Sequence, residues 1–241
     1  LSRLSTGVGN ARDLVALRFA LEQIPVLRSL LESLRTAPPQ ESALPQLGPG
    51  QEPAAPPLLQ ELARNLVPFP ELVELIQRAI VEDPPLSLKE GGLIRDGYNV
   101  TLDELRRAMR EGKDWIARYQ AEEIQRTGIP SLKVRFNSVF GYYIEVTRAN
   151  LDRVPAHYQR KQTIANGERF ITPELKEIEA KILGAEERTL KLEYELFQQV
   201  REKVLAYLAP LQQAAAALAQ ADVLAGLAET ARLHQYCRPV V

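Results

Sequence analysis

The chain has 241 residues, which is enough for one large domain or two small ones. Its hydrophobic fraction of 45% allows a normal globular core, and its net charge of −1 excludes a generally basic coat, so any site for a polyanion must be local. A single cysteine, Cys237, excludes an internal disulfide framework and a cysteine-based zinc cluster and fits a reducing compartment, while no apolar run is long enough to predict a transmembrane helix.

The N-terminal part predicts helices that are interrupted by proline. Apolar residues recur at helical spacing over residues 11–36, and Pro25 is expected to break or bend this helix. Residues 37–57 contain seven prolines and predict an extended linker, with a proline-motif docking site as the alternative. Residues 1–24 already read like the middle of a domain, so we expect the chain to be part of a longer protein.

Further helices are predicted on both sides of the chain's centre. Two short amphipathic helices are expected over residues 58–66 and 70–81, followed by a turn-rich segment over 82–99, where glycines permit backbone angles that other residues resist. Near the C-terminus, residues 211–236 are rich in alanine and predict a helix packed closely inside the main body. Both ends of the chain are therefore expected to contribute to one helical body.

Two long helices are predicted in between, over residues 101–127 and 173–208. Thr101 and Glu104 form a capping box at the start of the first helix, and Pro210 closes the second. In each helix, apolar or small residues recur at alternating steps of three and four, which predicts an antiparallel pair packed along one seam. The glycine in the first seam is either a bend point or a place of close helix approach. The seam residues are Leu102, Leu105, Met109, Gly112, Ile116 and Tyr119 in the first helix, and Leu175, Ile178, Ile182, Ala185, Thr189, Leu192 and Leu196 in the second.

The residues between the two long helices predict a small β-sheet. Residues 132–137, LKVRFN, alternate apolar and polar side chains in the manner of a half-buried strand. The following SVFG can turn the chain so that YYIEV runs back, and Asn166–Gly167 is a strong two-residue hairpin signal between KQTIA and ERFIT. Residues 148–158 are expected to be irregular or to form a helical turn. We therefore expect about four antiparallel strands.

The positive charge of the chain is concentrated on this insert, residues 130–173. The insert holds seven basic and three acidic residues, a net charge of +4, and because the whole chain carries −1 the remainder carries −5. Basic side chains together with Asn, Gln, Thr and Tyr are the usual set for phosphate contacts, which position a protein on a duplex without reading bases. A small surface sheet that is basic only for solubility is the alternative that charge alone leaves open.

No pattern of catalytic residues emerges from the sequence. There is no phosphate-binding loop of the G-x-x-x-x-G-K-[ST] type, and the two histidines, His157 and His234, lack ligand spacing. Acidic residues on the helices are explained by pairing with basic residues one turn away. We therefore expect no enzymatic activity, and no bound metal or cofactor, from this chain by itself.

Several stretches of the chain resemble the bacterial MutS family of DNA mismatch-repair proteins. They are EDPPLSLKEGGLIRDGYNVTLDELR, GIPSLKVRFNSVFGYYIEVTRANLDRVPAHYQRKQTIANGERFITPELKEIEAKI and LAQADVLAGLAE, and the opening LSRLSTGVGNARDLVALRFAL is similar too. The resemblance covers nearly the whole chain except residues 37–57, and the block from Leu132 to Lys181 is its most specific part.

The resemblance implies a mainly α fold, in which a helical core carries two long antiparallel lever helices with a small inserted antiparallel β-sheet, the clamp. The expected division is residues 1–129 for the core and first lever helix, 130–173 for the clamp, and 174–241 for the second lever helix and the return to the core. In this family the clamps of two subunits close over duplex DNA and hold its backbone without sequence preference.

The resemblance also implies that mismatch reading and ATP chemistry lie in other domains. In this family a separate N-terminal domain inserts a Phe at the mismatch, and a C-terminal domain binds ATP and Mg²⁺, hydrolyses ATP and dimerises; neither motif occurs in these residues. The implied partners are double-stranded DNA, a second MutS subunit and a MutL-type repair protein, in a cytoplasmic, nucleoid-associated setting without a membrane. The lever helices are expected to relay motion between the ATPase and the clamp.

Carried over by motif, the family's DNA-facing segment lies in the last hairpin of the insert. The candidate DNA-binding residues are Arg160, Lys161, Gln162, Thr163, Ile164, Ala165, Asn166, Arg169 and Thr172. Many relatives have Ala where this chain has Gly167, and the proline-rich stretch is longer than the linker usual in the family. The alternative hypothesis is a structural helical arm whose insert docks another protein.

Overall fold

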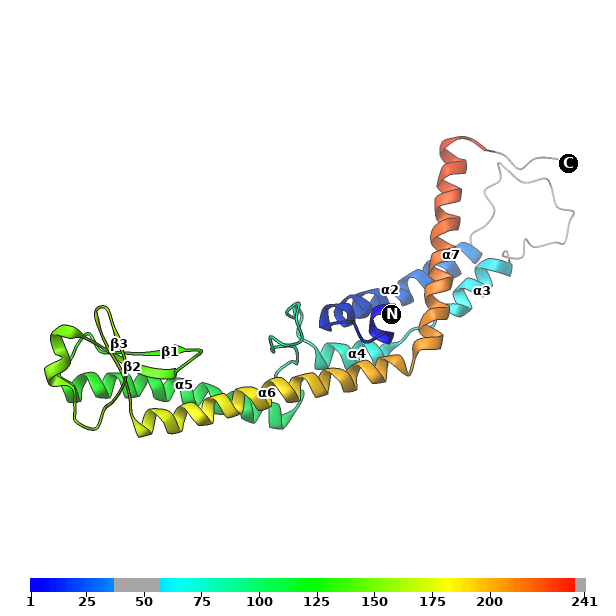
Figure 1. The fold of residues 1–241 in the computed structure, drawn as a ribbon. Coiled ribbons are helices and arrows are strands. Elements are labelled where there is room, and N and C mark those ends of the chain that lie inside the picture. The colour runs from blue at the N-terminus through cyan, green and yellow to red at the C-terminus, as the bar shows by residue number, and fades with distance from the viewer. Residues whose placement is uncertain (37–56, 237–241) are drawn as a thin grey trace, which may run out of the picture. The chain divides into compact units, whose positions relative to one another are not determined.

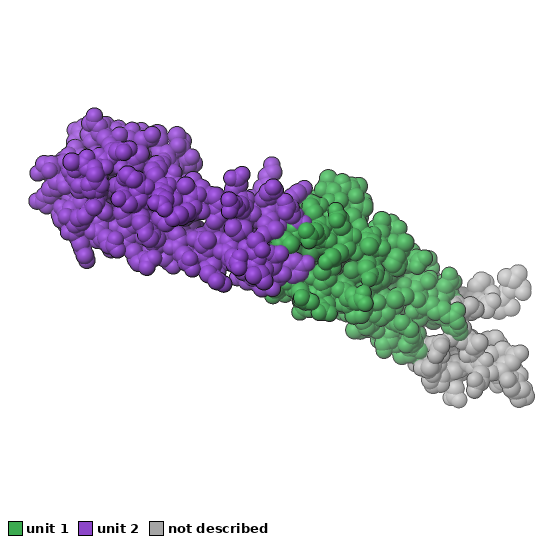
Figure 2. Space-filling model, turned by 90° about the horizontal axis from the view of Figure 1, so that it is seen from below, with its two compact units in different colours: residues 1–88, 92–95, 196–241 green, residues 89–91, 96–195 purple. Residues whose placement is uncertain are grey.

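A computed structural model describes residues 1–36 and 57–236 of the chain, so that the predicted linker, apart from Pro57, and Cys237 lie outside the described residues. The fold is mainly helical with one small antiparallel sheet, as predicted (Figure 1). The chain divides into two compact units (Figure 2). Unit 1 consists of Leu1–Leu88, Gly92–Arg95 and Leu196–Val241, and unit 2 of Lys89–Gly91 and Asp96–Glu195.

Unit 1 is a packed group of helices drawn from both ends of the chain, as expected. Helix α2 packs against α3 and α4, and α3 packs against α7, around buried side chains such as Leu14, Leu62 and Ile76. The helices are α1 (Ser2–Ser5), α2 (Ala11–Thr36), α3 (Pro57–Asn65), α4 (Pro70–Ala79), the last part of α6 (Pro173–Leu205) and α7 (Leu208–Leu233).

The sequence predicted that Pro25 breaks or bends this helix, and the break is wrong, because α2 continues through this residue without interruption. Proline removes only its own N–H from the helical ladder, and Pro25 lies on the exposed side of α2, where water can satisfy the carbonyl that this leaves free. Leu21 and Ile24 on the other side are buried. Their packing outweighs the local cost of the proline.

Helix α7 is buried over a shorter stretch than its composition predicted. Leu211, Ala214 and Ala217 are buried, whereas the side chains of the second half, for example Val223 and Leu227, are exposed. The second long helix also ends earlier than expected, at Leu205, and Pro210 lies in the first turn of α7. Proline is well tolerated there, because the first N–H groups of a helix have no intrahelical partner.

In unit 2, α5 (Val100–Thr127) and the first part of α6 form the predicted antiparallel pair. Successive contacts pair later residues of α5 with earlier residues of α6: the Tyr119 and Thr172 hydroxyls lie 2.7 Å apart, and Arg106 Nη2 donates to Glu193 Oε1 over 2.7 Å. The capping box was predicted wrongly, because the Asn99 side chain caps α5 by accepting from the N–H of Leu102.

Gly112 lies where the two helices of unit 2 approach closely. A Cβ atom added at this residue would lie only 2.5 Å from Cγ1 of Ile182. Of the two roles considered for this glycine, the structure therefore supports close helix approach. The two helices therefore touch at separate points along the seam, at Tyr119–Thr172, Gly112–Ile182 and Arg106–Glu193.

The insert forms the predicted four-stranded antiparallel sheet in the order β1-β2-β4-β3. Its elements are β1 (Lys133–Asn137), β2 (Gly141–Thr147), the short 3-10 helix η1 (Arg148–Arg153), β3 (Gln159–Ile164) and β4 (Gly167–Ile171). One face of the sheet contributes Ile144, Val146 and Phe170 to a core shared with Ile116 of α5 and Leu175 of α6. The sheet is thus fixed on the helical pair, as Figure 1 shows for α5.

Candidate nucleic-acid interface

The register of the sheet separates a packed face from an outer face. Directly paired residues of antiparallel strands share a face, and neighbours along a strand alternate between faces. Val134 pairs with Ile144 and Ile144 with Phe170, and these residues pack toward the helices. The other face, which we call the outer face, carries Lys133, Arg135, Tyr143, Glu145, Gln162 and Arg169.

The β3–β4 hairpin is present, but its turn is one residue earlier than predicted. Strand β3 ends at Ile164 and β4 begins at Gly167, so Ala165 and Asn166 are the turn residues, and both are exposed. Gly167 instead begins β4 and lies close to β2, since a Cβ atom there would lie 2.2 Å from the backbone oxygen of Val146. The hairpin therefore exposes the Asn166 side chain at its turn, while the residue after the turn packs closely against β2.

Arg160 and Lys161 precede this hairpin turn on an edge strand. The register shifts between Arg160 and Gln162, which marks an irregularity of the strand at Lys161. Arg160 is exposed and forms an ion pair with Glu168 over 3.3 Å, whereas the exposed side chain of Lys161 has no hydrogen bond or ion pair with any described residue. Lys161 is thus a cation without an internal partner among the described residues, whereas Arg160 shares its charge with Glu168.

Arg169 lies flat on the outer face and is partly buried. Its guanidinium carbon is 4.5 Å from the centre of the Tyr143 ring, and its Nη1 donates to Gln162 Oε1 over 2.7 Å. Its Nε is buried without an acceptor and lies 3.8 Å from Glu145 Oε2, too far for a hydrogen bond. Stacking and the Gln162 bond therefore hold the guanidinium in place while donors remain unused.

The sequence of the sheet and of the helices that carry it is similar to that of known proteins. The sequence model of MutS family domain IV matches residues 97–188. Residues 97–188 belong to MutS family domain IV. Nearly the whole chain, 99% of it, matches proteins named DNA mismatch repair protein MutS, with 48% identity in Halothermothrix orenii, 47% in Symbiobacterium thermophilum and 49% in Geobacillus kaustophilus. It spans about a quarter of the length of these relatives, covering 24%, 25% and 25% of them respectively.

The match to MutS family domain IV covers α5, the sheet and the beginning of α6, and all nine candidate residues lie within it. No helix in the part of the chain that the structure describes is long and apolar enough to cross a membrane.

Eight of the nine candidates lie on or beside the hairpin, and Thr172 does not share their surroundings. Its side chain is 1% exposed. The Thr172 hydroxyl accepts from the N–H of Leu175 over 3.2 Å at the start of α6 and lies 2.7 Å from the Tyr119 hydroxyl. These contacts engage the hydroxyl inside the protein, so we leave Thr172 out of the proposed DNA contact surface.

A buried carboxylate attaches the insert to α5. Glu123 accepts from the hydroxyl of Tyr158 and forms an ion pair with Arg126 over 2.6 Å, and Arg126 Nη2 also contacts His157 Nε2 at 2.8 Å. Burial, followed by the hydrogen bond to Glu123, raises the pKa of Tyr158. The phenol therefore stays protonated and keeps donating to the carboxylate.

A second carboxylate attaches the insert to α6. Glu179 accepts from the N–H of Tyr142 over 2.6 Å and from Lys176 over 2.9 Å, and Lys176 also donates to the carbonyl of Phe140 over 3.0 Å. Gly141 between them has a φ of 77°, and a Cβ atom there would collide with the Glu179 carboxylate. These side chains position the sheet, and sequence patterns did not single them out.

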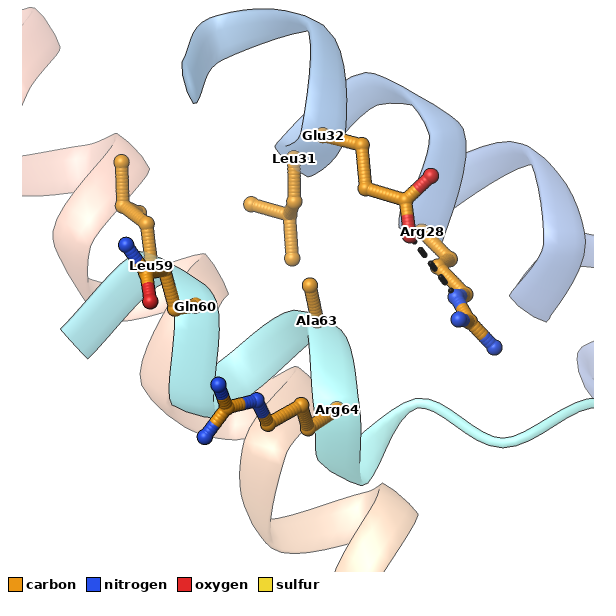
Figure 3. A pocket seen from close by; sticks show the side chains of 7 residues that line it. All are labelled: Arg28, Leu31, Glu32, Leu59, Gln60, Ala63 and Arg64. Carbon is orange, nitrogen blue, oxygen red and sulfur yellow. Dashed lines mark hydrogen bonds and ion pairs between the residues drawn. The ribbon is translucent and has the colours of Figure 1, made fainter. Parts of the chain in front are cut away.

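A hollow in unit 1 is a weaker candidate for a site (Figure 3). It lies between α2 and α3 and is lined by Arg28, Leu31, Glu32, Leu59, Gln60, Ala63 and Arg64. Arg28 Nε is paired with Glu32 Oε1 at 3.0 Å, and Arg64 extends away from Arg28. Its charges therefore do not converge on a common ligand position.

Proposed function

We propose that this chain is the DNA-holding segment of a mismatch-repair protein, in which the sheet is a clamp that contacts the duplex backbone without reading sequence. The observation that carries the proposal is the β3–β4 hairpin, where Lys161, Ala165 and Asn166 are exposed beside Arg160. Cationic and amide groups of this kind contact phosphate and sugar. The relatives of similar sequence are named for DNA mismatch repair, which supports the same function.

The helical pair of unit 2 would act as the lever of such a protein. Contacts run along its seam from Tyr119–Thr172 to Arg106–Glu193, and two carboxylates fix the sheet on it. In the longer protein we propose that this lever connects the clamp to a domain that binds ATP and Mg²⁺. A second subunit would supply the opposite clamp, and a MutL-type protein would act as the repair partner. Coupling along the lever requires two discrete arrangements that both sites bias.

Duplex binding by the chain itself tests the clamp. Labelled duplexes of two unrelated sequences are titrated at low salt by fluorescence anisotropy, with the unchanged chain and with Arg160→Ala/Lys161→Ala. Each phosphate contact contributes about 0.9 to the slope of log affinity against log salt, so we expect weaker binding and a slope smaller by up to about 1.8. Both duplexes should bind equally well, because the contacts do not read bases.

The matched control is Arg107→Ala/Arg110→Ala, which removes two exposed cations from α5 and changes the net charge by the same amount. It should leave duplex binding nearly unchanged. If the hairpin variant binds as the unchanged chain does, the hairpin is not the contact surface, and docking of another protein on the insert becomes the better explanation. Absence of duplex binding by the unchanged chain would refute the proposed function itself.

A further inference from the structure

We propose that the outer face of the sheet is a second contact surface for the phosphates of the same duplex, with Lys133 and Arg135 of β1 as its additional contact residues. This inference rests on the proposed function and extends it, because β1 lies at the opposite edge of the sheet from β3. The motif that carried over the candidate residues does not include either side chain. Their assignment comes from the register and charge of the sheet.

The register places the two cations in line with candidate residues of the hairpin. Lys133 pairs with Glu145, Glu145 with Arg169, and Arg169 with Gln162, so that one row crosses all four strands. Arg135 pairs with Tyr143 in the adjacent row. The outer face is therefore continuous with Gln162 and Arg169 and presents basic groups from one edge of the sheet toward the other.

Of the three cations on this face, Arg169 is ion-paired with Glu145, whereas Lys133 and Arg135 are not. Glu145 is the one carboxylate among the outer-face residues, and it lies 3.8 Å from Arg169 Nε. Lys133 and Arg135 are exposed, and their side chains make no hydrogen bond or ion pair with any described residue. An anion would thus meet cations that need not first give up an internal partner.

The size of the face fits a stretch of duplex backbone. Neighbouring strands lie about 4.8 Å apart, so four strands span roughly 14 Å from β1 to β3. One DNA strand advances about 3.4 Å per phosphate along the helix axis, so this width corresponds to about four phosphates. Lys133 and Arg135 can neutralise about two of them, since Arg169 already shares its charge with Glu145.

Cations on β1 have another physical explanation, which the experiment must separate. Strand β1 is an edge strand, and basic side chains on edge strands discourage pairing with the edge of another molecule. If Lys133 and Arg135 serve only this purpose, their loss causes self-association and leaves duplex binding unchanged. If they contact phosphate, their loss weakens duplex binding while the chain keeps its oligomeric state.

The test is a duplex titration over a range of salt concentrations with Lys133→Gln/Arg135→Gln. We expect about 10-fold weaker binding near 0.1 M salt and a salt slope smaller by up to about 1.8, the loss of two phosphate contacts. The charge-conserving variant Lys133→Arg/Arg135→Lys should retain the affinity and slope. The matched control Arg107→Gln/Arg110→Gln on α5 should also bind like the unchanged chain.

Several outcomes would overturn the inference. The first is that Lys133→Gln/Arg135→Gln binds duplex as tightly as the unchanged chain does. The second is that the α5 control weakens duplex binding by the same factor. The third is that polyglutamate displaces the labelled duplex as effectively as unlabelled duplex of equal charge does. Trp115 fluorescence and sedimentation verify fold and oligomeric state, and a misfolded double variant is replaced by the two single ones. If the hairpin variant loses affinity while the β1 variant does not, only this inference fails. If the unchanged chain does not bind duplex, the proposed function fails as well.

Discussion

Thr172 illustrates how a position within a motif and a position in space can differ. The residue follows β4 directly and lies only a few residues beyond the hairpin, so the family resemblance placed it among the DNA-facing residues. In the structure its hydroxyl accepts from the first turn of α6 and lies beside the Tyr119 hydroxyl. A threonine at this point is the usual kind of helix N-cap. Its identity is therefore explained by the start of α6 without a ligand.

Replacing this hydroxyl should affect stability and not binding. We expect Thr172→Ala to lower the free energy of unfolding by about 1–2 kcal/mol, because an N–H of α6 and the buried Tyr119 hydroxyl lose a partner. Thr172→Ser keeps the hydroxyl and should recover most of that loss. Chemical denaturation measures the stability, and duplex titration of the folded variants measures affinity. A well-folded Thr172→Ala chain with clearly reduced duplex affinity would return Thr172 to the contact surface.

At the scale of elements, the sequence predicted what depends on periodicity and missed what depends on particular contacts. The two long helices and the four strands follow from regular spacing of apolar residues, which tertiary packing reinforces. A break or bend was predicted at Pro25 because the cost of proline is local, whereas the packing of Leu21 and Ile24, which keeps α2 continuous, is not. The residue at which a helix begins depends on single hydrogen bonds, which sequence spacing does not show. The sequence therefore predicted Thr101 as the cap of α5, whereas the structure has Asn99 in this role.

For the candidate site too, the sequence predicted the features that depend on local pattern and missed those that depend on contacts between distant residues. The hairpin and its basic residues follow from composition and motif, but the half-burial of Arg169 against Tyr143 comes from cross-strand pairing that no local pattern reveals. The carboxylates that hold the sheet, Glu123 and Glu179, resemble ordinary surface residues of charged helices. Only the folded chain shows that each accepts hydrogen bonds from the insert.

Two glycines of the helical pair provide a matched test of the seam. A Cβ atom at Gly112 would press on Ile182, whereas one at Gly184 would meet nothing within 4 Å. Gly184→Ala should therefore stabilise the chain by about 0.5–1 kcal/mol through helix propensity alone. Gly112→Ala gains the same propensity but overpacks the seam, which costs about 1–3 kcal/mol.

Thermal or chemical unfolding of the two variants, compared with the unchanged chain, measures this difference. Adding Ile182→Val to Gly112→Ala should recover only a small part of the lost stability, because it removes Cδ1, 3.0 Å from the added Cβ, but keeps Cγ1, the closest atom at 2.5 Å. Equal stabilisation by the two alanine substitutions would show that the helices do not approach closely at Gly112.

At the scale of the whole molecule, charge and aromatic residues are distributed unevenly. The insert carries +4 in a chain of net charge −1, so electrostatic attraction to a polyanion should depend on the insert alone. The one tryptophan, Trp115, lies in unit 2 and stacks on Tyr119 with ring centres 4.8 Å apart. Its fluorescence therefore reports on unit 2, whereas circular dichroism reports on the helices of both units.

Alkaline pH should destabilise unit 2 before it affects the rest of the chain. Burial raises the pKa of Tyr119 and of Tyr158 above the usual 10.0, and the bond to Glu123 raises that of Tyr158 further. Below about pH 10 both states hold these protons, so stability is unaffected; above it the unfolded chain releases them while the folded chain does not. Stability should therefore fall as the pH rises above about 10. In unit 1 the pKa of Tyr207 is raised by a surface hydrogen bond to Glu71, which solvent weakens.

Trp115 fluorescence should accordingly change at a lower pH than the helical signal of the whole chain. Tyr158→Phe provides the control, because it keeps the ring and removes the ionisable hydroxyl. This variant should lose about 1 kcal/mol at pH 7, where Glu123 loses a donor, yet its stability should decline less steeply above pH 10, by up to about 1.4 kcal/mol per pH unit. Equal slopes in the two proteins would mean that Tyr158 ionises as readily in the folded chain as in the unfolded one, and the buried bond to Glu123 would then not be what holds the insert on α5.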